Sequence, residues 1–280
     1  MSQPRTAGRA AQRAESAGAE PATPSEPVLT VRSLRKVYNA GRGDEREAIR
    51  EVSFTVEKGE FLCVVGPSGA GKTTLLRCLS GLLPLTSGEA LFEGAPMRSV
   101  PQQVGVVFQD YSRSLFPWLT ISRNIAVPLK VRGVDKVARD ERVTEVLRAV
   151  GLGDVGKRYP WQLSGGMQQR VAIARALAYQ PDLLFMDEPF ASVDAQTRFD
   201  LEDLILRVRS EYGVTIVLVT HDIDEAVYLA DRVVVLSATP SVVKEVVGVP
   251  LARPRSQDAT RSHEQFTTLR QHLLKLVTGG

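Results

Sequence analysis

The sequence predicts an α/β fold built on a mostly parallel sheet, and three observations support this prediction. Short apolar runs, most of them rich in valine, recur at 104–108, 183–186, 214–219 and 233–236, as in strands that are covered on both faces. Stripes of apolar residues at helical spacing lie between these runs. A glycine-rich segment joins one further apolar run, Phe61–Val65, to a helical stripe. Strands that alternate with helices are typical of an α/β architecture.

The first 27 residues do not share this pattern. They are rich in Ala, Ser, Pro, Gly and Arg, and their three Arg are offset by three Glu. Because such a segment cannot bury enough apolar surface to order itself, we expect a disordered tail over residues 1–27. The regular pattern starts at 28–31, which, like 52–56, alternates apolar and polar residues as half-buried strands do.

Stripes of apolar residues predict the helices. Four of them run through the sets Leu75, Leu76, Leu79, Leu82; Val143, Val146, Leu147, Val150; Leu201, Leu204, Ile205, Val208; and Ile223, Ala226, Val227, Ala230. Gly151 follows the second set as a helix-terminating glycine. The segment 115–162 has helical signal without a convincing strand, so we expect a helical insertion there. A last stripe predicts an amphipathic C-terminal helix that packs onto the core rather than on a membrane, through Phe266, Leu269, Leu273, Leu276 and Val277.

The segment after Phe61–Val65 has the pattern G-x-x-x-x-G-K-[ST] and leads into a helical stripe. In that context the glycines let backbone N–H groups surround a phosphate, and the helix presents its positive N-terminus. We expect Lys72 to reach the β- and γ-phosphates and Thr73 to ligate Mg²⁺. The sequence therefore predicts a nucleoside triphosphate site made by Gly66, Pro67, Ser68, Gly69, Ala70, Gly71, Lys72, Thr73 and Thr74.

Three more polar residues follow predicted strands. Asp187 and Glu188 come directly after the run 183–186, and His221 closes the run 214–219. In α/β sheets, ligands bind at the carboxyl ends of the strands. We expect Asp187 to hold Mg²⁺, directly or through water, and Glu188 to polarise an attacking water. His221 is expected to reach the γ-phosphate, which makes Lys72, Glu188 and His221 the catalytic candidates.

A second anion-binding element opens another predicted helix. It consists of Ser164, Gly165 and Gly166, whose hydroxyl and exposed N–H groups suit an anion. A single bound triphosphate has no obvious use for two such helix starts. Two of them in one chain suggest that each completes the site of a partner copy.

In this order, the motifs resemble those of the ATP-binding cassette family, the motor subunits of ABC transporters, over residues 28–255. The loop 66–74 resembles the Walker A loop, 163–168 the signature motif and 183–187 the Walker B strand. Single residues match further family positions: the adenine-stacking aromatic, the Q-loop glutamine, the signature glutamine, the catalytic glutamate, the D-loop aspartate and the switch histidine, which are Tyr38, Gln109, Gln168, Glu188, Asp194 and His221.

The resemblance implies an ABC ATPase fold, with a P-loop NTPase core, an antiparallel β subdomain and a helical insertion. It places the ATPase domain at 28–250, its helical subdomain at about 110–165, and a C-terminal extension with a short helix at 251–280. It also implies ATP and Mg²⁺ as ligands. Gln109 would then join Thr73 and Asp187 at the metal.

The resemblance implies partners as well. Two copies would sandwich two ATP molecules, each between the Walker A loop of one copy and Ser164, Gly165 and Gly166 of the other. Closure on ATP and opening after hydrolysis would drive a permease in the membrane, docked at 110–118. A periplasmic or extracellular solute-binding protein would take part indirectly. The expected location is peripheral, at the cytoplasmic face of the cell membrane.

Two segments, 115–120 and 249–255, resemble the nitrate, sulfonate and taurine branch of importers, so ATP-driven import of such a solute is the leading hypothesis. The alternatives are an ATPase of an exporter or lipid-transport system, a soluble ABC-type ATPase that acts on nucleic acid or ribosomes, and a small-molecule kinase. A kinase leaves the element at Ser164 unexplained. The near balance of 35 basic and 32 acidic residues argues against a nucleic acid partner.

Composition adds two expectations. Apolar runs are only a handful of residues long, whereas a membrane-spanning helix needs roughly 20 apolar residues in succession. The two cysteines, Cys63 and Cys78, lie inside apolar segments, so we expect free buried thiols rather than a disulfide.

Overall fold

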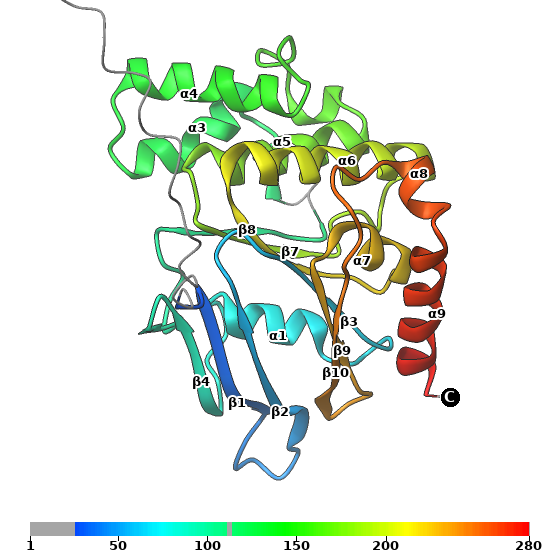
Figure 1. Ribbon diagram of the computed structural model, residues 1–280. Coiled ribbons are helices and arrows are strands. Elements are labelled where there is room, and N and C mark those ends of the chain that lie inside the picture. Colours follow the sequence, from blue (N-terminus) through cyan, green and yellow to red (C-terminus); the bar gives the residue numbers. More distant parts are fainter. Residues whose placement is uncertain (1–25, 111–113, 280) are drawn as a thin grey trace, which may run out of the picture.

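One mixed sheet runs through the protein, and helices cover both of its faces (Figure 1). The computed structural model describes residues 26–110 and 114–279. In these ranges the sheet has ten strands, in the order β5-β4-β1-β2-β10-β9-β3-β8-β7-β6. The expected disordered tail, residues 1–27, lies outside the described residues except for its last two positions.

The central strands form the predicted parallel sheet. Neighbours in the row β9, β3, β8, β7 and β6 all run parallel, and the register pairs Phe61 with Ile216 and Leu183 with Thr215. The bounds of these strands are β3 Phe61–Val65, β6 Val104–Val107, β7 Leu183–Asp187, β8 Thr215–Val219 and β9 Arg232–Leu236. Each of the five predicted apolar runs is therefore a strand, which confirms the α/β prediction.

The other half of the sheet is mainly antiparallel. β1 pairs with β2 and β4, β4 pairs with β5, and β10 joins the two halves, antiparallel to β9 and parallel to β2. The bounds are β1 Leu29–Tyr38, β2 Arg46–Val56, β4 Ser87–Phe92, β5 Ala95–Pro96 and β10 Ser241–Gly248. This half matches the antiparallel β subdomain that the family resemblance implies.

Sequence patterning missed part of this antiparallel half. It did not predict β4, β5 or β10, and it gave β1 and β2 only the portions 28–31 and 52–56. The reason is exposure: most side chains of β4 and β10 are partly or fully exposed, so these strands lack a continuous apolar signal. β1 and β2 carry register shifts between their paired residues, which interrupt the simple alternation of apolar and polar positions.

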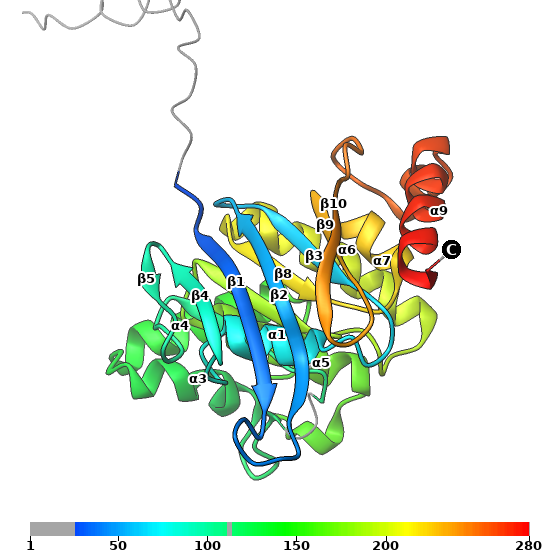
Figure 2. The same ribbon diagram turned by 90° about the horizontal axis from the view of Figure 1, so that it is seen from below.

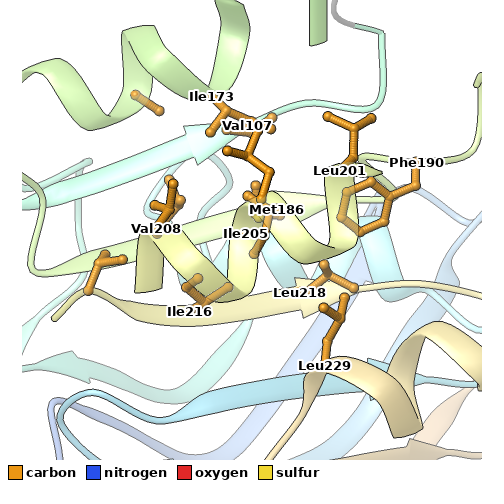
Figure 3. Close-up of a cluster of buried hydrophobic side chains, with 14 of the residues drawn as sticks. Val107, Ile173, Met186, Phe190, Leu201, Ile205, Val208, Ile216, Leu218 and Leu229 are labelled. Atoms are coloured by element: carbon orange, nitrogen blue, oxygen red, sulfur yellow. The ribbon is translucent and has the colours of Figure 1, made fainter. Parts of the chain in front are cut away.

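Alternate residues of the central strands supply two separate cores. On one face, β3 contributes Leu62 and Val64 to a cluster that includes α1 (Lys72–Leu79) and the antiparallel strands. On the other face lie α5 (Gly165–Ala178), α6 (Ala195–Tyr212) and α7 (Ile223–Leu229). Figure 3 shows this second cluster, where side chains of α6 pack over those of β7 and β8. The sheet is thus buried on both faces, as its valine-rich strands require.

The predicted helical insertion is present. Between 114 and 162 the described residues form α3 (Ile121–Val131), α4 (Lys136–Ala149) and the short 3₁₀ turn η1 (Pro160–Gln162), without a strand. α3 and α4 pack against α5 at one end of the molecule (Figure 1). Gly151, with φ +72°, follows α4 as predicted. The prediction was wrong at Leu82, which lies beyond the end of α1 and is 46% exposed.

The C-terminal stripe forms α9 (Glu264–Thr278), preceded by α8 (Gln257–Arg261). Phe266 and Leu273 of α9 are buried in the core, which confirms that this helix packs back onto the protein. α9 contacts α7, β9 and β10, and Figure 2 shows it along that flank. Among the described helices, none combines the length and the apolar character that crossing a membrane requires.

Candidate active site

The glycine-rich loop forms a cradle between β3 and α1. Residues 66–74 line a cavity of about 720 Å³ together with Glu188, His221 and Val277. Gly69 and Gly71 have φ values of +76° and +79°, which a residue with a Cβ adopts only under strain. Gly71 is also the N-cap of α1, so the positive end of the helix faces this cavity. The geometry suits an anion such as a phosphate.

Lys72 is the cation of this cradle. It is only 6% exposed, and its Nζ donates hydrogen bonds to the carbonyl oxygens of Gly66 at 3.0 Å and Pro67 at 3.1 Å. Burial lowers the pKa of the Lys72 ammonium, and the negative charges of Glu188 and Asp187 oppose that shift. The loop therefore holds a partly desolvated positive charge at its centre.

Asp187 and Thr73 form a pair of oxygen donors. The Thr73 hydroxyl donates to Asp187 Oδ1 at 3.0 Å, which links the start of α1 to the end of β7. Burial raises the pKa of Asp187, while the hydrogen bond from Thr73 opposes the rise. A hydroxyl and a carboxylate are hard donors of the kind that Mg²⁺ prefers. Within the described residues no group of three or more His, Cys, Asp or Glu side chains could hold a metal ion. A metal at Thr73 and Asp187 would take its other ligands from groups such as phosphate, amide or water oxygens.

A second cavity, of about 680 Å³, opens beside the first and shares Thr73 with it. Gln109 and Asp187 also line it, so the structure brings all three predicted metal-site residues to one place. Arg77, Arg175 and Tyr179 line its wall toward the helices. Exposed aromatic side chains lie at this end of the molecule: Phe108, Phe116 and, at 70% exposure, Trp118. The expected docking segment, 110–118, falls partly on residues 111–113, which lie outside the described ranges.

Glu188 and His221 meet across the mouth of the first cavity. His221 Nδ1 lies 3.0 Å from Glu188 Oε2. Glu188 has a φ of +42°, an unfavourable value for a residue with a side chain, and its N–H donates to the carbonyl of Val219 at 2.8 Å. The bond to β8 holds this strained backbone in place. Strain of this kind is found where a side chain must point into a site.

Tyr38 lies beside the loop. Its hydroxyl and the Thr74 hydroxyl are 3.0 Å apart, and the ammonium of Lys36 lies 5.3 Å from the centre of the Tyr38 ring. Tyr38, the last residue of β1, therefore lies next to the phosphate-binding loop.

The Ser164 element lies elsewhere. Ser164 is the N-cap of α5, where its Oγ accepts a hydrogen bond from the N–H of Met167, and Gln168 Nε2 donates to the carbonyl of Leu163. Ser164, Gly165, Gly166 and Gln168 line neither of the two cavities described above. One copy of the chain therefore does not bring its two anion-binding elements together.

The first turn of α6 connects several of these parts. Asp194 caps α6, and its carboxylate accepts bonds from the Thr197 N–H at 3.0 Å and the Thr197 hydroxyl at 2.7 Å, which lower the pKa of Asp194. A Cβ placed on Gly166 would lie 2.3 Å from the methyl carbon of Thr197, so a larger residue there would force the Thr197 side chain to move. The next residue, Arg198, pairs with Asp222 at 3.1 Å.

Sequence patterns did not predict these roles of Thr197 and Arg198. Both are polar residues in the first turn of α6, on the face that the apolar stripe continues, and nothing in their spacing identifies their partners.

Residues 49–191 match the family model described as ABC transporter. The chain belongs to the ABC transporter family. It is 42% identical over 247 residues to the aliphatic sulfonates import ATP-binding protein SsuB of Bacillus licheniformis, a match that covers 88% of this chain and 93% of that protein. It is 41% identical over 236 residues to the taurine import ATP-binding protein TauB of Escherichia coli, which covers 83% of this chain and 92% of that protein.

A solved structure agrees with this assignment. It is a dimeric ATP-binding cassette in a post-hydrolysis state, bound to ADP and phosphate, with a TM-score of 0.69 and 30% identity over 79% of this chain and 98% of that one. The ABC ATPase fold predicted from the sequence is confirmed. The chain is an ATP-binding ATPase subunit of this family.

Proposed function

We propose that this ATPase powers the import of a small sulfonate-type solute, such as an aliphatic sulfonate or taurine, or of nitrate. The solute class rests on the import functions in the names of SsuB and TauB and on the resemblance of 115–120 and 249–255 to that branch. The observation that carries the ATPase chemistry is the convergence of the loop 66–74, Glu188 and His221 on one cavity. The solute itself would be chosen by a permease and a solute-binding protein.

Within that cavity the residues divide the chemistry. The backbone N–H groups of the loop 66–74, in which Pro67 has none, and the Lys72 ammonium hold the β- and γ-phosphates, while Tyr38 stacks on the adenine. Glu188 takes a proton from the attacking water, and its strained backbone keeps the carboxylate at the cavity mouth. His221, 3.0 Å from Glu188, donates to the γ-phosphate and fixes the orientation of the carboxylate. These groups accelerate hydrolysis mainly by positioning and by charge stabilisation.

We propose Mg²⁺ as the metal partner of the nucleotide. Thr73, Asp187 and Gln109 line one cavity and supply a hydroxyl, a carboxylate and an amide oxygen. The ion would neutralise charge on the phosphate oxygens. The raised pKa of Asp187 would fall on metal binding, since a nearby cation favours the carboxylate.

We further propose a head-to-tail homodimer. The separation of the Ser164 element from both cavities supports it, because the N-terminus of α5, with Ser164, Gly165, Gly166 and Gln168, is free to complete the site of a second copy. Asp194 would lie at the same junction through its contacts in the first turn of α6. The dimeric cassette to which this chain is similar supports the arrangement.

The second cavity is the proposed docking surface for the permease. It lies between the helical insertion and the ATP cavity, and it shares Thr73 with that cavity. A segment of the permease seated among Phe108, Phe116 and Trp118 would sense the position of Gln109. In that assembly the subunit is peripheral, at the cytoplasmic face of the membrane. We assign the ATPase domain to 28–250, with its helical subdomain at about 110–165 and the C-terminal extension at 251–280.

One variant tests the catalytic and dimer proposals together. Glu188→Gln keeps the size of the side chain and removes the base, so we expect loss of steady-state ATP hydrolysis and accumulation of an ATP-bound dimer in sedimentation. Unchanged hydrolysis would refute the role of Glu188. A second variant, Ser164→Arg, tests the dimer alone. It should leave ATP binding by the monomer intact and block dimer formation. A dimer of this variant with ATP would refute the composite site.

The solute class needs a separate test. A strain that lacks the gene should fail to grow when an alkanesulfonate or taurine is the sole sulfur source, and growth should return with the intact gene. Normal growth on the sulfonates combined with failure on nitrate as the sole nitrogen source would assign the nitrate alternative instead. Normal growth on all three solutes would refute the proposed class.

A further inference from the structure

We propose that Glu225 is a positioning residue that holds the loop carrying His221 at the ATP cavity. The inference rests on the proposed role of His221 and adds to it a second residue, which lies outside the ATP cavity. Glu225 belongs to the first turn of α7 and is 4% exposed. No sequence motif considered above includes it, and it lines neither cavity.

Two hydrogen bonds in series connect Glu225 to both neighbours of His221. The Thr220 hydroxyl donates to Glu225 Oε2 at 2.6 Å, and the same hydroxyl oxygen accepts the N–H of Asp222 at 3.0 Å. Thr220 itself is buried, and its N–H donates to the carbonyl of Val64 on β3. The backbone on each side of His221 is therefore fixed to the sheet and to α7.

Asp222 is held from a second direction. Its Oδ1 caps α7 by accepting the N–H groups of Asp224 and Glu225, and its Oδ2 lies 3.1 Å from Arg198 Nη1. Arg198 Nε also lies 3.8 Å from Glu225 Oε1. The two carboxylates thus share one guanidinium from the first turn of α6. His221, between two restrained residues, is left with its imidazole exposed and directed at Glu188.

Stabilisation alone does not account for Glu225, because burial at this site disfavours an ionised carboxylate. The pKa of Glu225 is raised to about 8, mainly by burial and in smaller part by the nearby Asp222 and Glu202, while Thr220 and Arg198 act in the opposite direction. An apolar residue in this position would avoid that cost. What an apolar residue cannot do is accept the hydrogen bond that orients Thr220.

The test compares three variants of the full chain by steady-state ATP hydrolysis. Glu225→Ala and Thr220→Val both remove the 2.6 Å hydrogen bond, and Thr220→Val does so without a change of shape. We expect each to lower kcat by about tenfold, the effect of one lost buried hydrogen bond on the oriented state, with KM for ATP within about twofold of the parent. Glu225→Gln retains a carbonyl oxygen as acceptor and should keep kcat within about threefold.

The double variant Glu225→Ala with Thr220→Val should lose far less than the product of the two single effects, because both changes remove the same bond; fully multiplicative losses would overturn the proposed connection. Glu60→Gln is the matched control: Glu60 is also a buried acid and pairs with Arg232, but it precedes β3 at the end opposite the ATP cavity. Its kcat should equal that of the parent. Circular dichroism and the melting temperature of each variant establish which of them are folded under assay conditions.

Two outcomes separate this inference from the function on which it rests. His221→Ala with full hydrolysis would refute the proposed role of His221. His221→Ala with lost hydrolysis, together with folded Thr220→Val at the parental kcat, would overturn the positioning role of Glu225 alone. A tenfold rise in KM at unchanged kcat in Thr220→Val would also overturn it, since that pattern reports lost binding rather than lost orientation.

Discussion

The buried carboxyl of Glu225 gives the protein a pH-dependent stability that a single substitution should remove. Its pKa is raised from 4.5 to about 8 in the folded state, with burial as the main cause. The folded protein therefore binds more protons than the unfolded chain between these two values. The stability associated with this group is fully present below about pH 4.5 and is lost progressively as the pH rises through about 8.

The size of the effect follows from the two pKa values. With 1.36 kcal/mol for each pKa unit, the free energy of unfolding should fall by about 4 kcal/mol between pH 5 and pH 9 from this group alone. In Glu225→Gln the amide does not ionise, so this contribution disappears. Ionisable groups that do not interact with Glu225 contribute equally to both proteins and cancel in the difference.

The assay is urea unfolding of the parent and of Glu225→Gln, side by side, at several pH values from 5 to 9. We expect the stability of the variant relative to the parent to rise steadily across this range and to level off above about pH 8 to 9. Parallel curves, with a constant difference between the two proteins, would refute the reasoning and place the Glu225 carboxyl in a solvated environment.

Three further outcomes follow from the structure. Lys72→Ala removes the central cation of the loop and should weaken ATP binding by at least about tenfold in calorimetry, since a charged hydrogen-bonding group is lost; full affinity would contradict the cradle. Gly166→Ala places a methyl group 2.3 Å from Thr197 and should reduce hydrolysis without affecting ATP binding by the monomer, and Thr197→Ser in the same chain should restore much of it. Arg261→Met removes the charged partner of Glu202, which is fully buried and lies 2.7 Å from the guanidinium. In thermal and urea unfolding, the free energy of unfolding should fall by about 3 kcal/mol. An unchanged unfolding midpoint would refute the pairing.

Local patterns predicted the parts of the fold that are set by local chemistry. The buried parallel strands have continuous apolar sequences, and the loop 66–74 requires its glycines at a fixed spacing. Both could therefore be predicted from the sequence. The strands β4 and β10 could not be predicted, because most of their side chains are partly or fully exposed and only two residues of each strand are buried. α1 ends at Leu79 although the apolar stripe continues to Leu82, since periodicity does not mark where a helix ends.

The candidate site was predictable in its residue types and only partly in its contacts. Thr73 with Asp187, and Glu188 with His221, follow from strand ends that a parallel sheet places along one edge. The positive φ of Glu188 does not follow, because it depends on a hydrogen bond to a neighbouring strand far away in the sequence. The restraint of His221 by Glu225 could not be predicted either, because an acidic residue in the first turn of a helix has the same sequence pattern whether it is exposed or buried.

The two thiols of the protein have a practical consequence for studying its motions. Cys63 and Cys78 are both free and fully buried, and burial raises the pKa of Cys63 well above its usual value and that of Cys78 to about 11. The thiolate is the form that reacts with alkylating reagents, so neither native residue competes for a label in the folded protein. A cysteine introduced at an exposed position, such as that of Leu274, becomes the sole reactive thiol of a full-length chain with its core intact. Dyes attached there would test whether two copies approach each other on nucleotide binding, as the proposed dimer requires.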